Sequence, residues 1–341
     1  MPKSQYLPSF LCACFLFGCG STNEGRVVVY SPHGKELVDD FARRFEAENP
    51  GVRVQWLDMG SQDALDRVRS EKSNPQADIW WGAPSDMFMT AAEEGLLQAY
   101  EPSWSQHIEP SQRDSLHRWY GNFLTPEVIT FNSHALTREA APQDWDDLLD
   151  PKWKGKIVIR YPLASGTMRA IFSAMIWRFY KDTGAPQPGY DWLRKLDANT
   201  KSYPANPTLM YLQLARQEAL VTVWNMPDIE LQKQIYQSPF DYIVPRSGTP
   251  VLVEGLALVA NSKHPELAKK FYEFITTPES LVAQAVKYFR IPTRKDIPEE
   301  QLPTWISSTE IRPMAIDWKV VSEKSREWMK YWDERIKGAE K

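Results

Sequence analysis

Cysteine is scarce in this chain of 341 residues, and its three copies, Cys12, Cys14 and Cys19, all lie near the beginning. The rest of the chain therefore cannot form a disulfide, a cysteine-based zinc site or a thiol nucleophile. Histidine is also rare, and the five histidines form no cluster with the spacing of metal ligands. Basic runs are missing and the formal net charge is −4, so the sequence predicts no nucleic-acid partner.

Catalytic sequence motifs are absent as well. The chain contains no G-x-S-x-G nucleophile elbow, no H-E-x-x-H zinc motif, no Walker loop and no Rossmann fingerprint. The sequence therefore favours a binding protein without catalytic residues, metal or cofactor. Two alternatives from other classes are a periplasmic hydrolase that uses two carboxylates or a His–Ser pair, and a surface adhesion lipoprotein.

The first residues have the pattern of a secretory signal, in which the apolar run Leu11–Phe17 is followed by small residues. This run is too short to span a membrane. The sequence Leu16-Phe17-Gly18-Cys19 resembles a bacterial lipobox, in which the cysteine carries the lipid. We expect a lipoprotein signal peptide over residues 1–18, and a lipidated Cys19 with a tether over residues 19–25. Cleavage before Cys14 and a plain cleaved signal peptide are the alternatives.

The first half of the remaining chain alternates between buried strands and amphipathic helices. Such alternation with short connections predicts a parallel sheet with helices on both faces. Ligands of these sheets bind beyond the carboxyl ends of the strands, which here are the loops 31–34 and 82–85. The expected strands are Val27–Tyr30, Val52–Leu57 and Asp78–Trp81, and the expected helices are Lys35–Glu48, Gln62–Lys72 and Met87–Glu94.

A second feature is the segment Asp150–Phe172, which reads as a turn, a strand over Ile157–Arg160, a loop and the start of a helix at Ser165-Gly166-Thr167. A helix start offers free N–H groups and the positive end of the helix dipole, and Ser or Thr adds a hydroxyl. We therefore expect this loop to hold an oxygen-rich or anionic group. The alternative is that Ser165 only caps the helix.

Five segments follow one another along the chain: V-V-V-Y-S-P-H-G-K-E-L-V-D-D-F, A-D-I-W-W-G-A-P-S-D-M-F, P-Q-D-W-D-D-L-L-D-P-K-W-K-G-K-I-V-I, S-G-T and V-E-G-L-A-L-V-A-N-S-K-H-P-E-L-A-K-K-F-Y-E-F-I. In this order they resemble the extracellular solute-binding proteins of bacterial ABC importers. The resemblance is closest to the group that includes ferric-iron, phosphonate, sugar-phosphate, thiamine and polyamine binders.

The resemblance implies an α/β, type II periplasmic-binding-protein fold, in which two lobes with mainly parallel sheets are joined by hinge strands around a ligand cleft. We expect the crossings near 122–131 and 250–259, lobe one over residues 26–123 plus 254–341, and lobe two over residues 124–253. Trp318, Trp328 and Trp332 in the tail are expected to pack against lobe one. The expected protein is a monomer, a lipoprotein of the periplasm or cell surface, that delivers solute to the membrane subunits of an ABC permease with its ATPase.

The ferric-iron pattern of this group is not matched. Gly34 stands where the resemblance would place the iron-binding His, Ala83 where it would place the Glu, and Val223–Asp228 where it would place a Tyr pair. A different iron site built from His33, Tyr203, Tyr242 and Glu254 stays open. Polyamine binding also stays open, if Asp86, Asp228 and Glu254 face the cleft beside a tryptophan.

The candidate cleft combines hydroxyls, amides, indoles and an imidazole with nearby arginines. Because guanidinium groups bind phosphate and carboxylate strongly, the sequence favours a small phosphorylated or phosphonate-bearing organic anion as the ligand. The expected ligand-binding residues are Ser31, His33, Gly82, Ser85, Ser165, Gly166, Thr167, Arg169, Trp224, Asn225 and Glu254.

Overall fold

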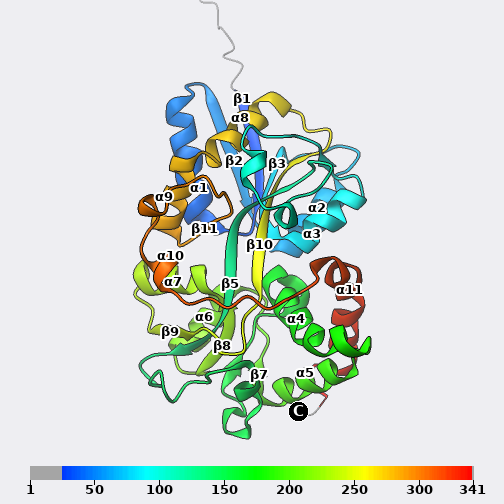
Figure 1. The fold of residues 1–341 in the computed structure, drawn as a ribbon, viewed down its shortest axis with the longest axis vertical. Helices are drawn as coiled ribbons and strands as arrows, with labels where there is room; N and C mark the ends of the chain where they lie inside the picture. The colour runs from blue at the N-terminus through cyan, green and yellow to red at the C-terminus, as the bar shows by residue number, and fades with distance from the viewer. Residues whose placement is uncertain (1–24, 340–341) are drawn as a thin grey trace, which may run out of the picture.

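The computed structural model describes residues 25–339, which form two lobes stacked along the long axis of the molecule (Figure 1). The predictions of a signal peptide and of a lipid on Cys19 lie outside the described residues. Within residues 25–339, no helix is long and apolar enough to cross a membrane.

The first lobe begins with the parallel strands and helices that the alternation predicts. Consecutive apolar residues make β1 suited to burial on both faces, so Val27 and Val29 pack into one core and Val28 and Tyr30 into another. The sheet order is β2-β1-β3, and α2 and α3 cover the opposite face from α1 (Figure 1). The elements are β1 (Gly25–Ser31), α1 (Gly34–Glu48), β2 (Val52–Asp58), α2 (Ser61–Ser70), β3 (Ile79–Pro84), α3 (Ser85–Glu93) and β4 (Leu97–Gln98).

Two long antiparallel strands, β5 (Tyr120–Asn132) and β10 (Val251–Val259), run between the lobes (Figure 1). Strand β10 pairs with β3 in the first lobe, and the far half of β5 pairs with β8 and β9 in the second. These strands lie where the resemblance predicts the crossings.

The second lobe has one hydrophobic core among the described residues, and α4 packs at its centre. The strand expected over Ile157–Arg160 is only two residues long, whereas the helix that follows Ser165 extends to Thr183. The elements are β6 (Ile157–Val158), α4 (Gly166–Thr183), α5 (Gln187–Asn199), β7 (Thr200–Ser202), α6 (Pro207–Ala215), β8 (Val221–Asn225), α7 (Met226–Gln234) and β9 (Phe240–Ile243). Short 3-10 turns cover Ser105–His107, Pro110–Gln112, Trp145–Leu149, Pro151–Trp153, Pro162–Ala164 and Glu299–Gln301.

The C-terminal part of the chain begins in the first lobe and ends in the second. After β11 pairs with β5, the chain crosses over, and Trp177 Nε1 of α4 donates to the Ala315 carbonyl at 2.9 Å. Helix α11 then lies against α4 and α3 (Figure 1). The elements are α8 (Pro265–Ile275), α9 (Pro278–Tyr288), β11 (Ile291–Pro292), α10 (Trp305–Ser308) and α11 (Trp318–Arg335).

One prediction about this tail is wrong. Trp318, Trp328 and Trp332 pack into the core of the second lobe, not the first. The Trp332 ring lies 5.3 Å from that of Phe172 and 5.1 Å from that of Tyr203. The physical reason is that the connecting segment carries the chain past the hinge strands, so the apolar face of α11 meets the second lobe. Apart from this helix, the division of the lobes at residues 123 and 253 stays a prediction.

Candidate functional site

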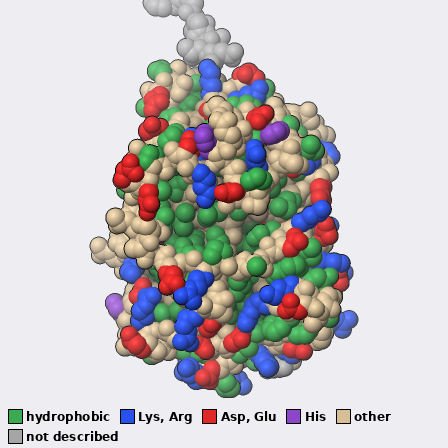
Figure 2. All heavy atoms as spheres, viewed as in Figure 1, with side chains coloured by type: hydrophobic (Ala, Val, Ile, Leu, Met, Phe, Trp, Pro, Cys, Tyr) green, Lys and Arg blue, Asp and Glu red, His purple; other side chains and the backbone are tan. Residues whose placement is uncertain are grey.

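A cavity of about 460 Å³ lies between the lobes, and we call it the interlobe cavity. Both lobes supply its walls, which is the arrangement expected of a site that closes around a ligand. Figure 2 shows that charged side chains gather toward the two ends of the viewed face, while its middle is largely apolar and hollowed. The lining residues are Pro32, His33, Glu36, Asp58 and Arg290 from the first lobe and Pro207, Thr208, Tyr211, Asp228, Leu231, Gln232 and Tyr236 from the second.

The imidazole of His33 is held against unusual backbone at the end of β3. Gly82 has φ +91°, and a Cβ there would lie 1.8 Å from His33 Nε2, so only glycine leaves room for the ring. Ala83 follows at φ 145°, a conformation that a residue with a side chain rarely adopts. Backbone strain of this kind concentrates at ligand clamps and active sites. It therefore marks this end of β3 as a functional candidate.

Glu254 of β10 stabilises that strained turn. Its Oε2 accepts from the Ala83 N–H at 2.8 Å and lies 3.7 Å from His33 Nε2, while Thr125 Oγ1 donates to Oε1 at 3.3 Å. Burial raises the pKa of Glu254 to about 7. Burial and the charge of Arg290 lower the pKa of His33 to about 3. The imidazole is therefore neutral at neutral pH and can accept or donate a hydrogen bond.

Asp228 of α7 joins the two lobes through Arg290. Arg290, only 4% exposed, donates to Asp228 Oδ1 at 3.0 Å, and its guanidinium lies 5.1 Å from the centre of the Phe123 ring. Asn225 Nδ2 and Trp224 Nε1 donate to Oδ2 at 2.9 and 3.2 Å. Burial alone would raise the pKa of Asp228, but Arg290 and the Asn225 hydrogen bond outweigh it and the pKa is lowered. Asp228 is thus a compensated anion, with its charge taken up by protein groups.

Arg160 is a second cation near this cavity, and its Nη2 donates to the Ala164 carbonyl at 3.4 Å. Its guanidinium lies 5.6 Å from the centre of the Trp224 ring, and its Nε has no hydrogen-bond partner in the described part of the chain. Burial lowers the pKa of Arg160, while Tyr211 and the carboxylates Asp63, Asp228 and Asp58 act in the opposite direction. A buried guanidinium with an unused donor is suited to a ligand oxygen.

Glu127 of β5 was not expected from the sequence. It is fully buried, and neither carboxyl oxygen has a partner among residues 25–339. Burial, then Glu254 and Asp228, raise the pKa of Glu127 well above its ordinary value. A glutamate that follows a proline in an apolar strand forms no sequence pattern that would predict its burial beside Glu254 and Asp228.

The family model described as "Bacterial extracellular solute-binding protein" matches residues 40–313. The chain belongs to this family. A relative named "Probable ABC transporter periplasmic-binding protein y4fP", from Sinorhizobium fredii, is 26% identical over 89% of this chain and 84% of its own length. The "Putative 2-aminoethylphosphonate-binding periplasmic protein" of Salmonella typhimurium is 26% identical over 80% of each chain.

The solved structure of the periplasmic binding protein AfuA from Actinobacillus pleuropneumoniae, with exogenous fructose-6-phosphate bound, has the same fold. It superimposes with a TM-score of 0.80 at 24% identity and covers 93% of this chain and all of its own. The protein is accordingly a solute-binding transport protein of ABC importers and not an enzyme. This confirms the family, the fold class and the binding role predicted from the sequence.

In this solute-binding protein, five of the residues expected to bind ligand converge at or beside the interlobe cavity: His33, Gly82, Trp224, Asn225 and Glu254. Asn225 also caps α7, because its Oδ1 accepts from the Asp228 N–H at 2.9 Å. Ser31 Oγ accepts from the His33 N–H at 3.2 Å and shapes the loop, and Ser85 is the first residue of α3. Their contact with solute stays a prediction.

The start of α4 does not line the interlobe cavity. Ser165 Oγ accepts from the Met168 N–H at 3.2 Å, so Ser165 caps the helix, which is the alternative that the sequence leaves open for it. Gly166 packs against the first lobe so closely that a Cβ would lie 2.8 Å from Pro84 Cδ and 2.9 Å from Ser61 Cβ. The lobes therefore touch at Gly166, where the sequence predicts an anion, and Thr167 is the next residue of α4.

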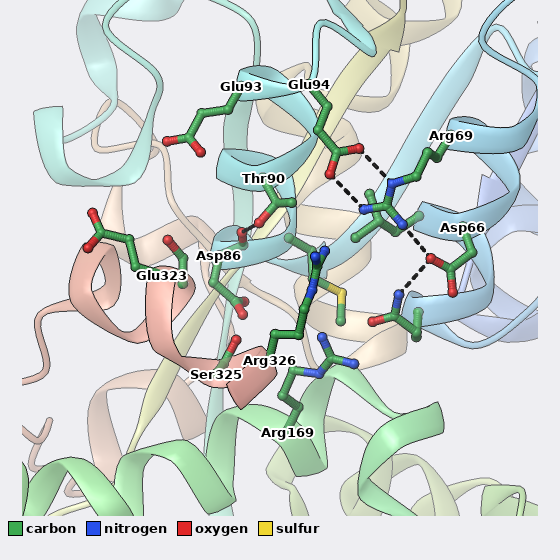
Figure 3. Close-up of a pocket in the computed structure, with 14 residues that line it drawn as sticks. Asp66, Arg69, Asp86, Thr90, Glu93, Glu94, Arg169, Glu323, Ser325 and Arg326 are labelled. Carbon is green, nitrogen blue, oxygen red and sulfur yellow. Dashed lines mark hydrogen bonds and ion pairs between the residues drawn. The ribbon is translucent and has the colours of Figure 1, made fainter. Parts of the chain in front are cut away.

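Arg169, one turn further along α4, faces a different cavity together with Asp86 (Figure 3). Trp80 and Trp81 are both fully buried, in cores on opposite faces of the first sheet.

The alternative iron site is not assembled either. His33 and Glu254 lie together, but Tyr203 donates to Asp197 at 2.7 Å and packs on Trp332 in the second lobe. Tyr242 lies on β9, paired with Thr130. Within residues 25–339, no group of three or more His, Cys, Asp and Glu side chains is placed to hold a metal ion.

Proposed function

We propose that this protein captures a small phosphorylated or phosphonate-bearing organic solute in the interlobe cavity and delivers it to an ABC permease. The observation that carries the proposal is Arg160, which lies beside this cavity with an unused Nε donor, whereas Arg290 lines the cavity but is paired with Asp228. Guanidinium groups bind phosphoryl oxygens through paired, charge-assisted hydrogen bonds. The aminoethylphosphonate and fructose-6-phosphate named for the similar proteins are solutes of this class.

The solute is captured by closure of the lobes, because both lobes supply walls of the cavity. A solute that contacts both lobes binds the closed arrangement better than an open one, and so shifts the protein toward closure. Asp228 with Arg290 and Tyr236 with Glu36 already join the lobes at this cavity. These contacts stabilise the closed arrangement, and Arg160 supplies the charge for the solute.

Anchoring of the protein through a lipid on Cys19 is part of the proposal, and it would hold the protein at the periplasmic or outer cell surface as a monomer. Growth of the producing cells with labelled palmitate tests it. Label in the native protein and none in a Cys19→Ser variant is the expected result, whereas equal labelling or none in both contradicts the anchor.

The ligand is tested by a thermal-shift screen of phosphate esters, phosphonates, polyamines, sugars, thiamine and ferric citrate. A ligand at a hundredfold excess over its dissociation constant stabilises the folded form by about 2.7 kcal/mol. We expect a shift with a phosphorylated or phosphonate compound that is lost in Arg160→Gln and kept in Arg43→Gln, which alters an arginine at the exposed surface of α1. A shift with phosphate-free sugars alone contradicts the proposal.

A polyamine is the second candidate, because Glu36, Asp58 and Asp228 also line the cavity. Carboxylates attract ammonium groups, but Asp228 is already compensated by Arg290. The same screen decides between the two candidates. A shift with spermidine that survives Arg160→Gln and is lost in Asp58→Asn would favour the polyamine.

A further inference from the structure

A second cavity, of about 730 Å³, lies between α2 and α3 of the first lobe and α4 and α11 of the second (Figure 3). We call it the α3–α11 cavity, and it shares no lining residue with the interlobe cavity. Most of its lining side chains are polar or charged, so it is suited to a hydrophilic molecule. The lining residues are Gln62, Leu65, Asp66, Arg69, Asp86, Met87, Thr90, Glu93, Glu94, Arg169, Ser322, Glu323, Ser325 and Arg326.

One of the three arginines in this cavity is already neutralised. Arg69 binds Glu94 with two nitrogens, at 2.6 and 2.9 Å, and Asp66 at 2.5 Å (Figure 3). Its donors are therefore committed to protein carboxylates. Arg69 forms a fixed part of the wall and is not free to bind a ligand.

Asp86 is the residue whose unpaired carboxyl oxygen indicates a missing binding partner. It lies in the first turn of α3, is only 4% exposed, and its Oδ1 has no hydrogen-bond partner in the described chain. Figure 3 shows its carboxyl group directed into the cavity, toward the side chain of Arg169. An unmade hydrogen bond on a buried carboxylate is costly, so such groups are normally paired.

Two guanidinium groups face Asp86 from the second lobe. Arg169 of α4 has an Nε without a partner in the described residues, and Arg326 of α11 forms no ion pair with any of them. Figure 3 shows both side chains reaching into the space below Asp86. Arg169 Nε and the exposed Arg326 thus face the Asp86 Oδ1 that is unpaired within residues 25–339. Glu93 and Glu323, which also form no ion pair with the described residues, lie at the edge of the cavity (Figure 3).

We propose that the α3–α11 cavity is a second binding site, for a small zwitterion of the amino-acid type. The carboxylate of such a molecule lies between Arg169 and Arg326, and its ammonium group pairs with Asp86. A plain anion fits less well, because it leaves Asp86 Oδ1 without a partner in the described chain. A polycation fits less well because of the two uncommitted guanidinium groups. This inference does not depend on the solute proposed for the interlobe cavity.

Binding here is coupled to lobe closure. Asp86 belongs to the first lobe and both arginines to the second, so an occupant contacts both lobes and favours the arrangement in which they are close. An amino acid in the α3–α11 cavity therefore acts as a positive effector of solute capture.

Calorimetric titration of the protein with the standard amino acids tests the proposal. For L-serine the matched analogues are 3-hydroxypropionate, which lacks the amino group, and ethanolamine, which lacks the carboxylate. We expect at least one amino acid to bind, and its analogue lacking either group to bind about tenfold to a hundredfold more weakly, the loss of one charged hydrogen bond. Failure of every amino acid to bind, or equal binding of the analogues, overturns the proposal.

Two variants, with two controls, locate the site. Asp86→Asn and Arg326→Gln are expected to weaken amino-acid binding about tenfold or more, and Arg326 is exposed, so its replacement leaves folding intact. The control is Lys319→Gln, an exposed position in the first turn of the same helix. Arg160→Gln separates the two sites, because it removes binding in the interlobe cavity only. Amino-acid affinity that falls with Arg160→Gln, and not with Arg326→Gln, contradicts the assignment.

Discussion

The two cavities lie between the same lobes but hold their charges differently. At the interlobe cavity, Asp228 is compensated by Arg290, and His33 is fixed between Gly82 and Phe123. At the α3–α11 cavity, Asp86 Oδ1 and Arg169 Nε have no hydrogen-bond partner among the described residues, and the exposed Arg326 forms no ion pair with them. In the closed arrangement the first site thus holds Asp228 and His33 in place through protein contacts, whereas the second leaves polar atoms for an occupant to pair with. Rigid preparation reduces the entropy lost on binding, and unpaired buried charge favours any molecule that supplies the partner.

The largest effect is expected from removing the side chain that anchors α11, a helix that lines the α3–α11 cavity and not the interlobe cavity. Trp332 is fully buried, so Trp332→Ala should lower the free energy of unfolding by about 3–5 kcal/mol, as for other buried aromatic side chains. Urea unfolding measures this. Trp305→Ala, at a partly buried tryptophan of α10, is the matched control and should cost clearly less. Equal losses would mean that α11 is not anchored as described.

The next largest loss of stability is expected from a substitution in the strained backbone beside His33. Gly82→Ala places a methyl group on the imidazole and an alanine at φ +91°, and overpacking plus the left-handed backbone should cost about 2–5 kcal/mol. Gly155→Ala is the control, because Gly155 also has positive φ but nothing within 4 Å of a Cβ. The control should lose about 1 kcal/mol in the same unfolding assay. If both variants lose the same amount, His33 does not pack on Gly82.

A dependence on pH is expected at the interlobe cavity through Glu254. Burial raises its pKa to about 7, whereas glutamate in an unfolded chain titrates near about 4.3. Between these values the folded protein keeps a proton that the unfolded chain loses, so this residue lowers stability as pH rises through the window. Glu254→Gln removes the effect. The stability of the variant relative to the native protein should rise by up to about 3 kcal/mol between about pH 4 and pH 7 and then level off.

Urea unfolding at several pH values measures this difference. A constant offset, from the altered hydrogen bonds to Ala83 and Thr125, does not affect the slope. Parallel stability curves for the two proteins would show that Glu254 is ionised normally in the folded state.

The smallest effect is expected at the surface of the interlobe cavity, where Tyr236 hydrogen-bonds Glu36 of the other lobe. Tyr236→Phe removes one exposed interlobe hydrogen bond, worth about 0.5 kcal/mol in the closed arrangement, and should weaken solute binding about twofold. Tyr331→Phe is the control, since its ring stacks on Tyr190 within the second lobe. A loss greater than about tenfold would make Tyr236 a direct solute contact.

The sequence predicts the fold well because its apolar runs alternate with amphipathic helices, so β1 to α3 follow from local pattern alone. Half of the site follows for the same reason: His33 lies in the loop after β1, and Gly82 and Asn225 lie near the ends of β3 and β8. Arg290 could not be predicted, because its position depends on β11, a two-residue strand whose pairing with β5 leaves no sequence pattern. The placement of α11 also depends on a crossing segment without regular structure.

The start of α4 shows the limit of reasoning from one segment. Ser165-Gly166-Thr167 has the composition of an anion site, but Gly166 instead allows the lobes to touch at Pro84 and Ser61. Local sequence indicates a tight approach of backbone at that position. Only the relative placement of the lobes decides whether a ligand or the other lobe approaches.

That contact provides the most direct test of capture by closure. Gly166→Ala adds a methyl group that meets Pro84 and Ser61 only when the lobes are together. Calorimetric titration with the phosphorylated or phosphonate solute found in the screen should show about tenfold to a hundredfold weaker binding, because an overpacking cost of about 1–3 kcal/mol falls on the closed state alone. The thermal midpoint without solute should stay the same. Unchanged affinity in this variant would contradict the claim that the two lobes close around the solute.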